Sequence, residues 1–249
     1  MPKKRPVSEY PEGARRKAAI IQVATELFAS NGYRDASLAS IADGAGLTQP
    51  GLLHHFPSKS ELLLAVLRGR ELRDKALVAD AIKEFPDDVA HLLEALVSHN
   101  STDRNDTSLH TVISAEATSP SHPAHDFFVA RYSRVRNALR RSMAKSTATP
   151  LTDDQALALA TISMAVMDGL QVQWLLDPEV DMVANFKVFG MLLQRALLAT
   201  EELRPSAAIR LACPAQSTGP GVLAEHECGR RPSGTRPSTG RPSPRSPGR

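Results

Sequence analysis

Residues 48–55 carry side chains of the kinds that bind nucleic acids. The amide of Gln49 can pair with the edge of an adenine in the major groove, and His54 and His55 can donate to phosphate, more strongly when protonated. Gly51 would let the backbone approach DNA closely, which would account for a glycine that costs a helix roughly 1 kcal/mol. The candidate DNA-contacting residues are Ser37, Thr48, Gln49, Pro50, Gly51, Leu53, His54, His55 and Lys59.

Two short helices would hold these side chains outward. Ser37 is a favourable N-cap for the first helix, and Gly46 ends it after about two turns. Thr48 caps the second helix, where Pro50 in the first turn does no harm because its missing N–H is not needed there. The apolar residues that would pack the pair together are Leu38, Ile41, Ala42, Ala45, Leu47, Leu52 and Phe56.

A helix of eight residues is a rod of about 12 Å, which matches a major groove about 12 Å wide. We therefore predict a helix-turn-helix over residues 37–56, against the alternative of a plain helical hairpin inside a bundle. The capping hydroxyls of Ser37 and Thr48 can still donate to phosphate. Lys59 would add a positive charge at the N-terminus of a long fourth helix, which a capping box at residues 58–61 begins.

Helical periodicity covers the rest of the chain up to residue 204, and no strand with alternating polarity is found. A helix that precedes the pair ends at Asn31 and Gly32, and the fourth helix continues to about Ile82. Further helices are predicted over residues 87–99, 106–118, 123–146, 154–176 and 180–203. The fold class is therefore all-α, with about nine helices in a three-helix head and an antiparallel helical bundle.

Charge divides the chain into three parts. Residues 1–59 hold eight Lys and Arg against five Asp and Glu, residues 60–204 hold 15 against 20, and residues 205–249 hold seven against two. A basic front on an acidic body is typical of a nucleic-acid reader joined to a part that does not touch nucleic acid. Residues 205–249 are rich in Pro, Gly, Ser and Arg and predict a disordered tail, either inert or adding non-specific DNA affinity.

Several classes of protein are disfavoured. No apolar region follows the N-terminal Lys and Arg residues, and the apolar stretch 156–167 is too short to span a bilayer, so a cytoplasmic protein without a membrane partner is expected. Cys213 and Cys228 form neither a disulfide framework nor a zinc site. No Gly-rich phosphate loop or Gly-x-Ser-x-Gly motif is present, so neither an enzyme nor a cofactor is predicted. His122, His125 and Asp126 lack a further metal ligand, which favours a solvated helix start.

A dense set of residues resembles the N-terminal domain of the tetracycline-repressor (TetR) family over about residues 14–74. The matching residues are Gly32-Tyr33, Ser37, Ile41-Ala42, residues 45–48, Leu52, residues 55–59 and Glu61-Leu62-Leu63. Leu53 departs from the pattern, because the family usually has a tyrosine there whose phenol contacts a phosphate. His54 or His55 could replace that contact. Beyond residue 74 the resemblance is one of helix layout.

The resemblance implies a homodimeric regulator, a repressor that a small-molecule ligand releases from a palindromic double-stranded DNA operator. The implied organisation is a flexible arm (1–13), a DNA-binding domain (14–74), a ligand-sensing and dimerisation domain (75–204) and the tail (205–249). The last two helices, 154–176 and 180–203, are the expected dimer face. Candidate ligand-binding residues are His110, Glu116, Phe127, Phe128, Met167, Asp168, Gln171 and Trp174. An interaction protein that has lost DNA binding is the remaining alternative.

Overall fold

The computed structural model describes residues 10–86, 88–145 and 151–198. Within these ranges the chain forms nine helices and no strands, as the periodicity predicts. The helices are α1 (Tyr10–Asp35), α2 (Leu38–Gly44), α3 (Gln49–His55), α4 (Lys59–Glu84), α5 (Val89–Asn100), α6 (Arg104–Glu116), α7 (His125–Lys145), α8 (Asp153–Leu176) and α9 (Met182–Leu198).

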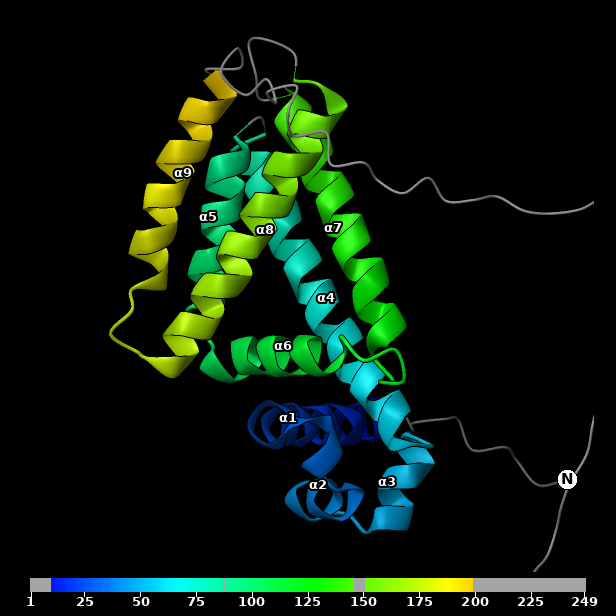
Figure 1. Cartoon of the computed structure of the whole chain (residues 1–249). Coiled ribbons are helices and arrows are strands. Elements are labelled where there is room, and N and C mark those ends of the chain that lie inside the picture. The colour runs from blue at the N-terminus through cyan, green and yellow to red at the C-terminus, as the bar shows by residue number, and fades with distance from the viewer. Residues whose placement is uncertain (1–9, 87, 146–150, 199–249) are drawn as a thin grey trace, which may run out of the picture. The chain divides into compact units, whose positions relative to one another are not determined.

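The first three helices and the start of α4 pack around one apolar core. Phe28 of α1, Leu52 of α3 and Leu62 of α4 are completely buried in this core. Leu109 and Ile113 of α6 belong to the same core, and α6 lies directly against α1 (Figure 1). The head is therefore joined to the rest of the described unit by continuous apolar packing, which transmits displacements because close-packed interiors deform little.

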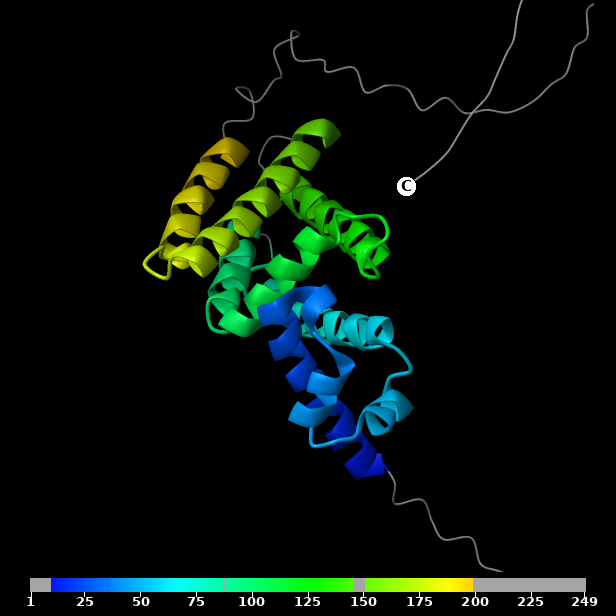
Figure 2. The same ribbon diagram turned by 60° about the horizontal axis from the view of Figure 1, so that its bottom comes forward.

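A second apolar core holds the remaining helices together. Phe186 of α9, Met143 of α7 and Leu93 of α5 are completely buried there. Figure 2 shows α8 and α9 running side by side in opposite directions, on the far side of α6 from the head. This arrangement is the predicted antiparallel bundle.

Helix boundaries follow the capping residues. Ser37, Thr48 and Ser58 cap α2, α3 and α4 as predicted, and Thr152 forms a full capping box with Gln155 at the start of α8. Asp88 and Asp103 cap α5 and α6. Asp103 therefore starts α6 two residues before the predicted position.

The expectation of a flexible arm over residues 1–13 is wrong for residues 10–13, which belong to α1. Pro11 is compatible with a helix here because it lies in the first turn. Glu12 and Arg16, four residues apart, form an ion pair of 2.8 Å that supports that turn. Residues 1–9, residues 199–203 and the tail 205–249 with its two cysteines lie outside the described residues.

The apolar part of α8 is longer than the stretch 156–167. The helix has 24 residues, and by length and composition alone it could cross a membrane. Length and composition are weak evidence for a membrane span, because the core helix of a soluble bundle can have the same length and composition. Ala156, Ala160 and Met164 are buried against the other helices, and Asp168 interrupts the apolar sequence near the middle of the helix.

Candidate nucleic-acid interface and effector cavity

α3 is held in place by its apolar side. Leu52 is completely buried, and Phe56, the C-cap, is 8% exposed. At the other end the Gly51 N–H donates to Thr48 Oγ1 over 3.2 Å, so the hydroxyl hydrogen of Thr48 stays available to a ligand. The short helix is therefore fixed at both ends, while Gln49, Pro50 and His54 remain exposed.

The turn before α3 depends on two glycines. Gly46 has a φ of 67°, a left-handed conformation that other residues rarely adopt. The Leu47 N–H donates to the Ala42 carbonyl over 2.8 Å and closes the turn. Gly44 lets α2 approach α1, because a Cβ there would lie 2.8 Å from a methyl group of Val23.

The candidate DNA-contacting residues fall into two classes of exposure. Ser37, Thr48, Gln49, Pro50 and His54 are exposed, whereas Gly51, Leu53, His55 and Lys59 are partly buried. The exposed members lie at one end of the described unit, on α3 and at the start of α2 (Figure 1). This end can therefore present an amide, a hydroxyl and an imidazole to a macromolecule.

Lys59, a candidate phosphate-binding residue, already makes contacts within the fold. Its Nζ donates to the Arg34 carbonyl over 2.9 Å and lies 4.6 Å from the centroid of the Tyr33 ring. Both contacts tie the start of α4 to the end of α1. The structure thus gives Lys59 a positioning role that the sequence reasoning did not foresee.

Glu116, a candidate ligand-binding residue, contacts the head instead of the cavity. Its Oε2 accepts the Tyr33 N–H over 2.9 Å and lies 3.4 Å from Nε2 of His122. Gly32, with a φ of 71°, leaves room for this carboxylate. Burial lowers the pKa of His122, while Glu116 acts in the opposite direction. Glu116 therefore joins α6 to the head.

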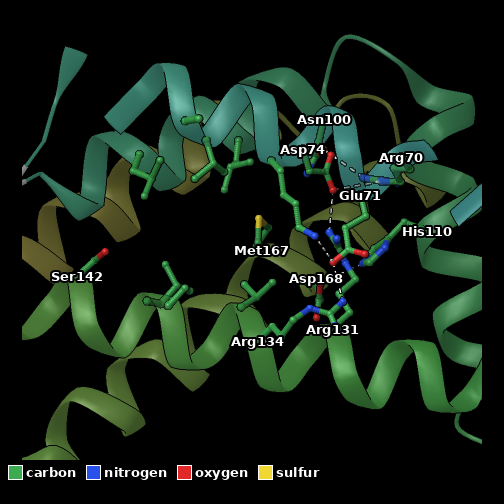
Figure 3. A pocket seen from close by; sticks show the side chains of 18 of the residues that line it. Arg70, Glu71, Asp74, Asn100, His110, Arg131, Arg134, Ser142, Met167 and Asp168 are labelled. Carbon is green, nitrogen blue, oxygen red and sulfur yellow. Dashed lines mark hydrogen bonds and ion pairs between the residues drawn. The ribbon is translucent and has the colours of Figure 1, made fainter. Parts of the chain in front are cut away.

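A cavity of about 370 Å³ lies between α4, α5, α7 and α8, and His110 of α6 also lines it. This volume is within the roughly 300–1,000 Å³ of small-molecule sites. Most of its wall is apolar, and charged side chains gather at one end (Figure 3). The larger apolar lining residues are Val78, Ile82, Leu92, Leu96, Val135, Leu139 and Met167.

Ion pairs join α4 to α7 at the charged end of the cavity. Arg131 of α7 donates to Asp74 over 2.8 Å, and Arg134 donates to Glu71 over 2.6 Å. Arg70, which is 3% exposed, donates to the Asp106 backbone carbonyl. Its Nε also lies 3.4 Å from the Asp106 carboxylate. Burial lowers the pKa of Arg70, and the two neighbouring carboxylates oppose this effect.

Three less strongly bonded polar groups line the same end. Burial lowers the pKa of His110 well below its ordinary value, which favours the neutral imidazole. Burial raises the pKa of Asp168, whose Oδ2 accepts a 2.7 Å hydrogen bond from the Tyr132 hydroxyl. Gln171 is 2% exposed, and its Oε1 has no hydrogen-bond partner among the described residues.

The structure brings together half of the candidate ligand-binding residues. His110, Met167, Asp168 and Gln171 line the cavity. Phe127 and Phe128 pack instead with the core of the head, and the Trp174 ring lies 5.2 Å from the guanidinium of Arg104. Large apolar side chains of this kind favour a pocket in the sequence, but Phe127 and Phe128 lie on helix faces that pack into the core of the head. Trp174 lies against the guanidinium of Arg104.

Sequence reasoning missed Arg70, Asp74 and Arg131 as lining residues. The spacing of Arg70 and Asp74, four apart on α4, and of Arg131 and Arg134, three apart on α7, places each pair on one helix face. Such charged faces in the middle of an apolar bundle are the signal that could have indicated them.

The outer faces of α8 and α9 carry exposed apolar side chains. These are Leu157, Ile162, Val172 and Leu176 on α8 and Val188, Met191 and Leu192 on α9. Met164 of α8 and Phe186 of α9 are buried inside the bundle instead. The apolar residues of these two helices, the expected dimer face, therefore divide into core residues and an exposed face.

The histidine pair near residue 122 is engaged in structural contacts. His125 Nδ1 lies 2.8 Å from the Ala117 carbonyl, and the His122 ring lies edge-on to Tyr33. Within the part of the chain that the structure describes, no three His, Cys, Asp or Glu side chains are grouped to hold a metal ion.

Comparison with known proteins finds a family whose model resembles the head. Residues 20–66 match the family model described as "Bacterial regulatory proteins, tetR family". The HTH-type transcriptional repressor KstR2 of Mycobacterium tuberculosis is 41% identical over 54 residues, which are 22% of this chain and 27% of that protein. The HTH-type transcriptional regulator RutR of Escherichia coli is 38% identical over 77 residues, 31% of this chain and 34% of that protein. The sequence matches thus span about a third or less of these relatives' own length.

Solved structures extend the likeness to the whole described fold. A transcriptional regulator from Rhodococcus sp. Rha1 has a TM-score of 0.62 at 18% identity, covering 72% of this chain and 96% of that one. NalD, the secondary repressor of an efflux pump in Pseudomonas aeruginosa, has a TM-score of 0.60 at 20% identity, covering 75% and 97%. These proteins are transcriptional regulators and not enzymes, and at such identities the likeness concerns the fold.

Proposed function

We propose that this chain, whose residues 20–66 match the model of the tetR family of bacterial regulatory proteins, is a sequence-specific DNA-binding transcriptional regulator. The observation that carries the proposal is the geometry of α3. Its buried Leu52 anchors a short, doubly capped helix whose exposed face presents Thr48, Gln49 and His54. A rod of this size fits a major groove.

The proposed contacts divide into base reading and phosphate binding. Gln49 would read a base edge through its amide, because an amide pairs its donor and acceptor with adenine. The hydroxyls of Ser37 and Thr48 and the imidazoles of His54 and His55 would donate to phosphates. Leucine at position 53 has no donor for a phosphate.

We infer that the regulator is a homodimer through α8 and α9. Exposed side chains such as Ile162 and Leu192 form an apolar face that a second copy would cover. A two-fold axis there would present two copies of α3 about one DNA turn apart, near 34–36 Å, to a palindromic operator.

We infer further that a small molecule in the cavity between α4 and α8 releases the operator. The apolar core shared by α1 and α6 and the bond from Tyr33 to Glu116 supply a physical link from the cavity helices to the head. A ligand acts in this way only if it binds the released conformation more tightly. Repression is the proposed direction of control.

The experiment is a binding titration of the full chain with DNA from its own upstream region and with random DNA. Gln49→Ala should reduce the discrimination between the two by about 1–3 kcal/mol, the worth of one base contact. His99→Ala, at an exposed residue of α5 outside the proposed DNA-contacting and dimer faces, is the control and should leave the discrimination unchanged. Equal affinity of the wild type for both DNAs would favour an interaction protein instead.

A further inference from the structure

We propose that the cavity between α4, α5, α7 and α8 takes an uncharged, mainly apolar molecule with a hydroxyl group, and that this hydroxyl lies against His110, Asp168 and Gln171. The inference rests on the proposed function, in which this cavity holds the effector, and adds the chemical class of that effector. Three features of the wall support it: the pairing of its charges, the hydrogen-bonding groups left over, and the apolar remainder.

Every arginine and lysine that lines the described cavity already faces a carboxylate. Arg131 pairs with Asp74, Arg134 with Glu71, and Lys75 lies 3.4 Å from Glu71. Arg70 faces Asp106 and, at 3.8 Å, Asp74. An anionic ligand would therefore have to compete with a carboxylate for its cation. The cost of breaking a pair is greatest for Arg70 and Arg131, whose pairs with Asp74 and Asp106 are largely buried.

A cationic ligand meets the opposite obstacle. Asp168 is the lining carboxylate that has no arginine or lysine within ion-pair distance among the described residues. Arg70 and Arg131 lie near enough to act on its charge, so they would repel an ammonium group at the same place. Burial also raises the pKa of Asp168, which lowers the attraction that its carboxylate offers a cation.

The groups left over are those that a hydroxyl can satisfy. His110 Nε2 lies 3.9 Å from Asp168 Oδ1, which is too long for a hydrogen bond. Gln171 Oε1 is a buried acceptor without a donor, and leaving a buried polar atom unpaired is unfavourable. A hydroxyl both donates and accepts, so it can give its hydrogen to the unpaired Gln171 Oε1 and accept from His110, with Asp168 beside it. A ketone would supply only an acceptor and leave Gln171 Oε1 unpaired.

The rest of the wall requires an apolar body. Leu92, Val135 and Met167 are among the side chains that surround the space away from the charged end. Each methylene group that leaves water for such a wall contributes about the same favourable increment. The combination of one hydrogen-bonding corner and an apolar wall is the usual layout of a specific small-molecule site.

The test compares four eight-carbon probes that differ in the head group: 1-octanol, 2-octanone, octanoate and octylammonium. Isothermal titration of the full-length protein without DNA should give the tightest binding for 1-octanol. Octanoate and octylammonium should bind at least about tenfold more weakly, because their charge must be desolvated while the lining cations already face carboxylates and Arg70 and Arg131 repel a cation beside Asp168. If either ion binds as tightly as 1-octanol, the assignment of an uncharged ligand is wrong.

Gln171→Leu separates the hydrogen bond from the apolar contribution. The binding of 1-octanol should weaken about five- to tenfold, which corresponds to the loss of one hydrogen bond. The affinity for 2-octanone should change by less than about twofold. The variant should not lower the melting temperature, since it replaces a buried amide whose oxygen is unpaired with an apolar group of similar size. Gln173→Leu, two residues away and exposed, is the matched control and should behave like the wild type. Equal weakening of both probes would overturn the assigned role of Gln171.

The outcomes separate this inference from the proposed function. A protein that binds its upstream DNA selectively but none of the four probes would refute the hydroxyl site and leave the regulator intact. A protein that ranks the probes as expected but does not distinguish its upstream DNA from random DNA would refute the regulator and retain the site.

Discussion

Gly46 shows how a single backbone angle positions α3. Its φ of 67° is accessible to glycine without strain, and a Cβ added there would meet open space. A substitution therefore acts through the backbone conformation alone and not through a clash. Few positions in the head offer so clean a separation of the two effects.

Gly46→Ala should lower the free energy of unfolding by about 1–2 kcal/mol, because other residues pay that much in the left-handed region. Gly69→Ala in the interior of α4 is the control and should raise stability by up to about 1 kcal/mol. Its added Cβ would meet only the end of the Arg73 side chain, at 3.9 Å. Chemical denaturation of both variants tests the pair, and a Gly46→Ala protein as stable as the wild type would contradict the role of the turn.

His110 makes stability depend on pH. Burial lowers its pKa well below the ordinary 6.5, and Arg70 and Arg131 act in the same direction. As the pH falls through the ordinary value of 6.5, His110 takes up a proton in the unfolded chain but not in the folded protein. The free energy of unfolding therefore decreases. Asp168, whose pKa is raised, acts in the opposite direction at lower pH.

Replacing His110 with Gln should therefore flatten the fall in stability between about pH 7 and pH 5.5. His99→Gln, which changes an exposed histidine, should leave the slope as it is in the wild type. The measurement is denaturant unfolding at a series of pH values. An unchanged slope for the His110 variant would mean that the fold does not lower the pKa of His110.

At the scale of the helix, α8 and α9 each present two different faces. One face of each packs into the core through Met164 and Phe186, and the other leaves Ile162, Met191 and Leu192 exposed. Exposed apolar side chains gathered on two neighbouring helices are typical of an interface. Because a two-fold interface is formed by the same patch of both subunits, a single substitution there changes the interface at two positions.

Leu192→Glu should convert the proposed dimer into a monomer in sedimentation equilibrium. Each leucine that remains in water forgoes about 1.5–3 kcal/mol of burial, and the buried glutamates would repel each other. Leu72→Glu on α4, at a leucine that is 68% exposed, is the control and should not alter the association state. A dimeric Leu192 variant would place the interface elsewhere.

The whole molecule combines a basic N-terminal part with an acidic body. If α3 and its neighbours bind DNA phosphates, operator affinity should fall steeply with salt, with a slope of about −0.9 per phosphate contact in a logarithmic plot. Gln49→Ala should change selectivity and leave this slope unaltered, since Gln49 reads a base. A flat salt titration of the wild type would argue against phosphate binding.

The sequence by itself determined the helices and the head. Ser37, Thr48 and Ser58 are capping residues whose effect is local, and the spacing of Leu52 and Phe56 fixes the inner face of α3. Local signals of this kind act between residues a few positions apart, so they can be read without knowing the fold.

Only the tertiary structure decided which distant side chains meet. Glu116 bonds to Tyr33, Lys59 to the end of α1, and Arg131 to Asp74, each across dozens of residues. Such partners depend on how helices cross, and the same apolar pattern allows a residue to face a core, a cavity or a second copy. For that reason Phe128 and Gln171 could be named together from the sequence, while the fold buried the first in the head core and placed the second at the cavity.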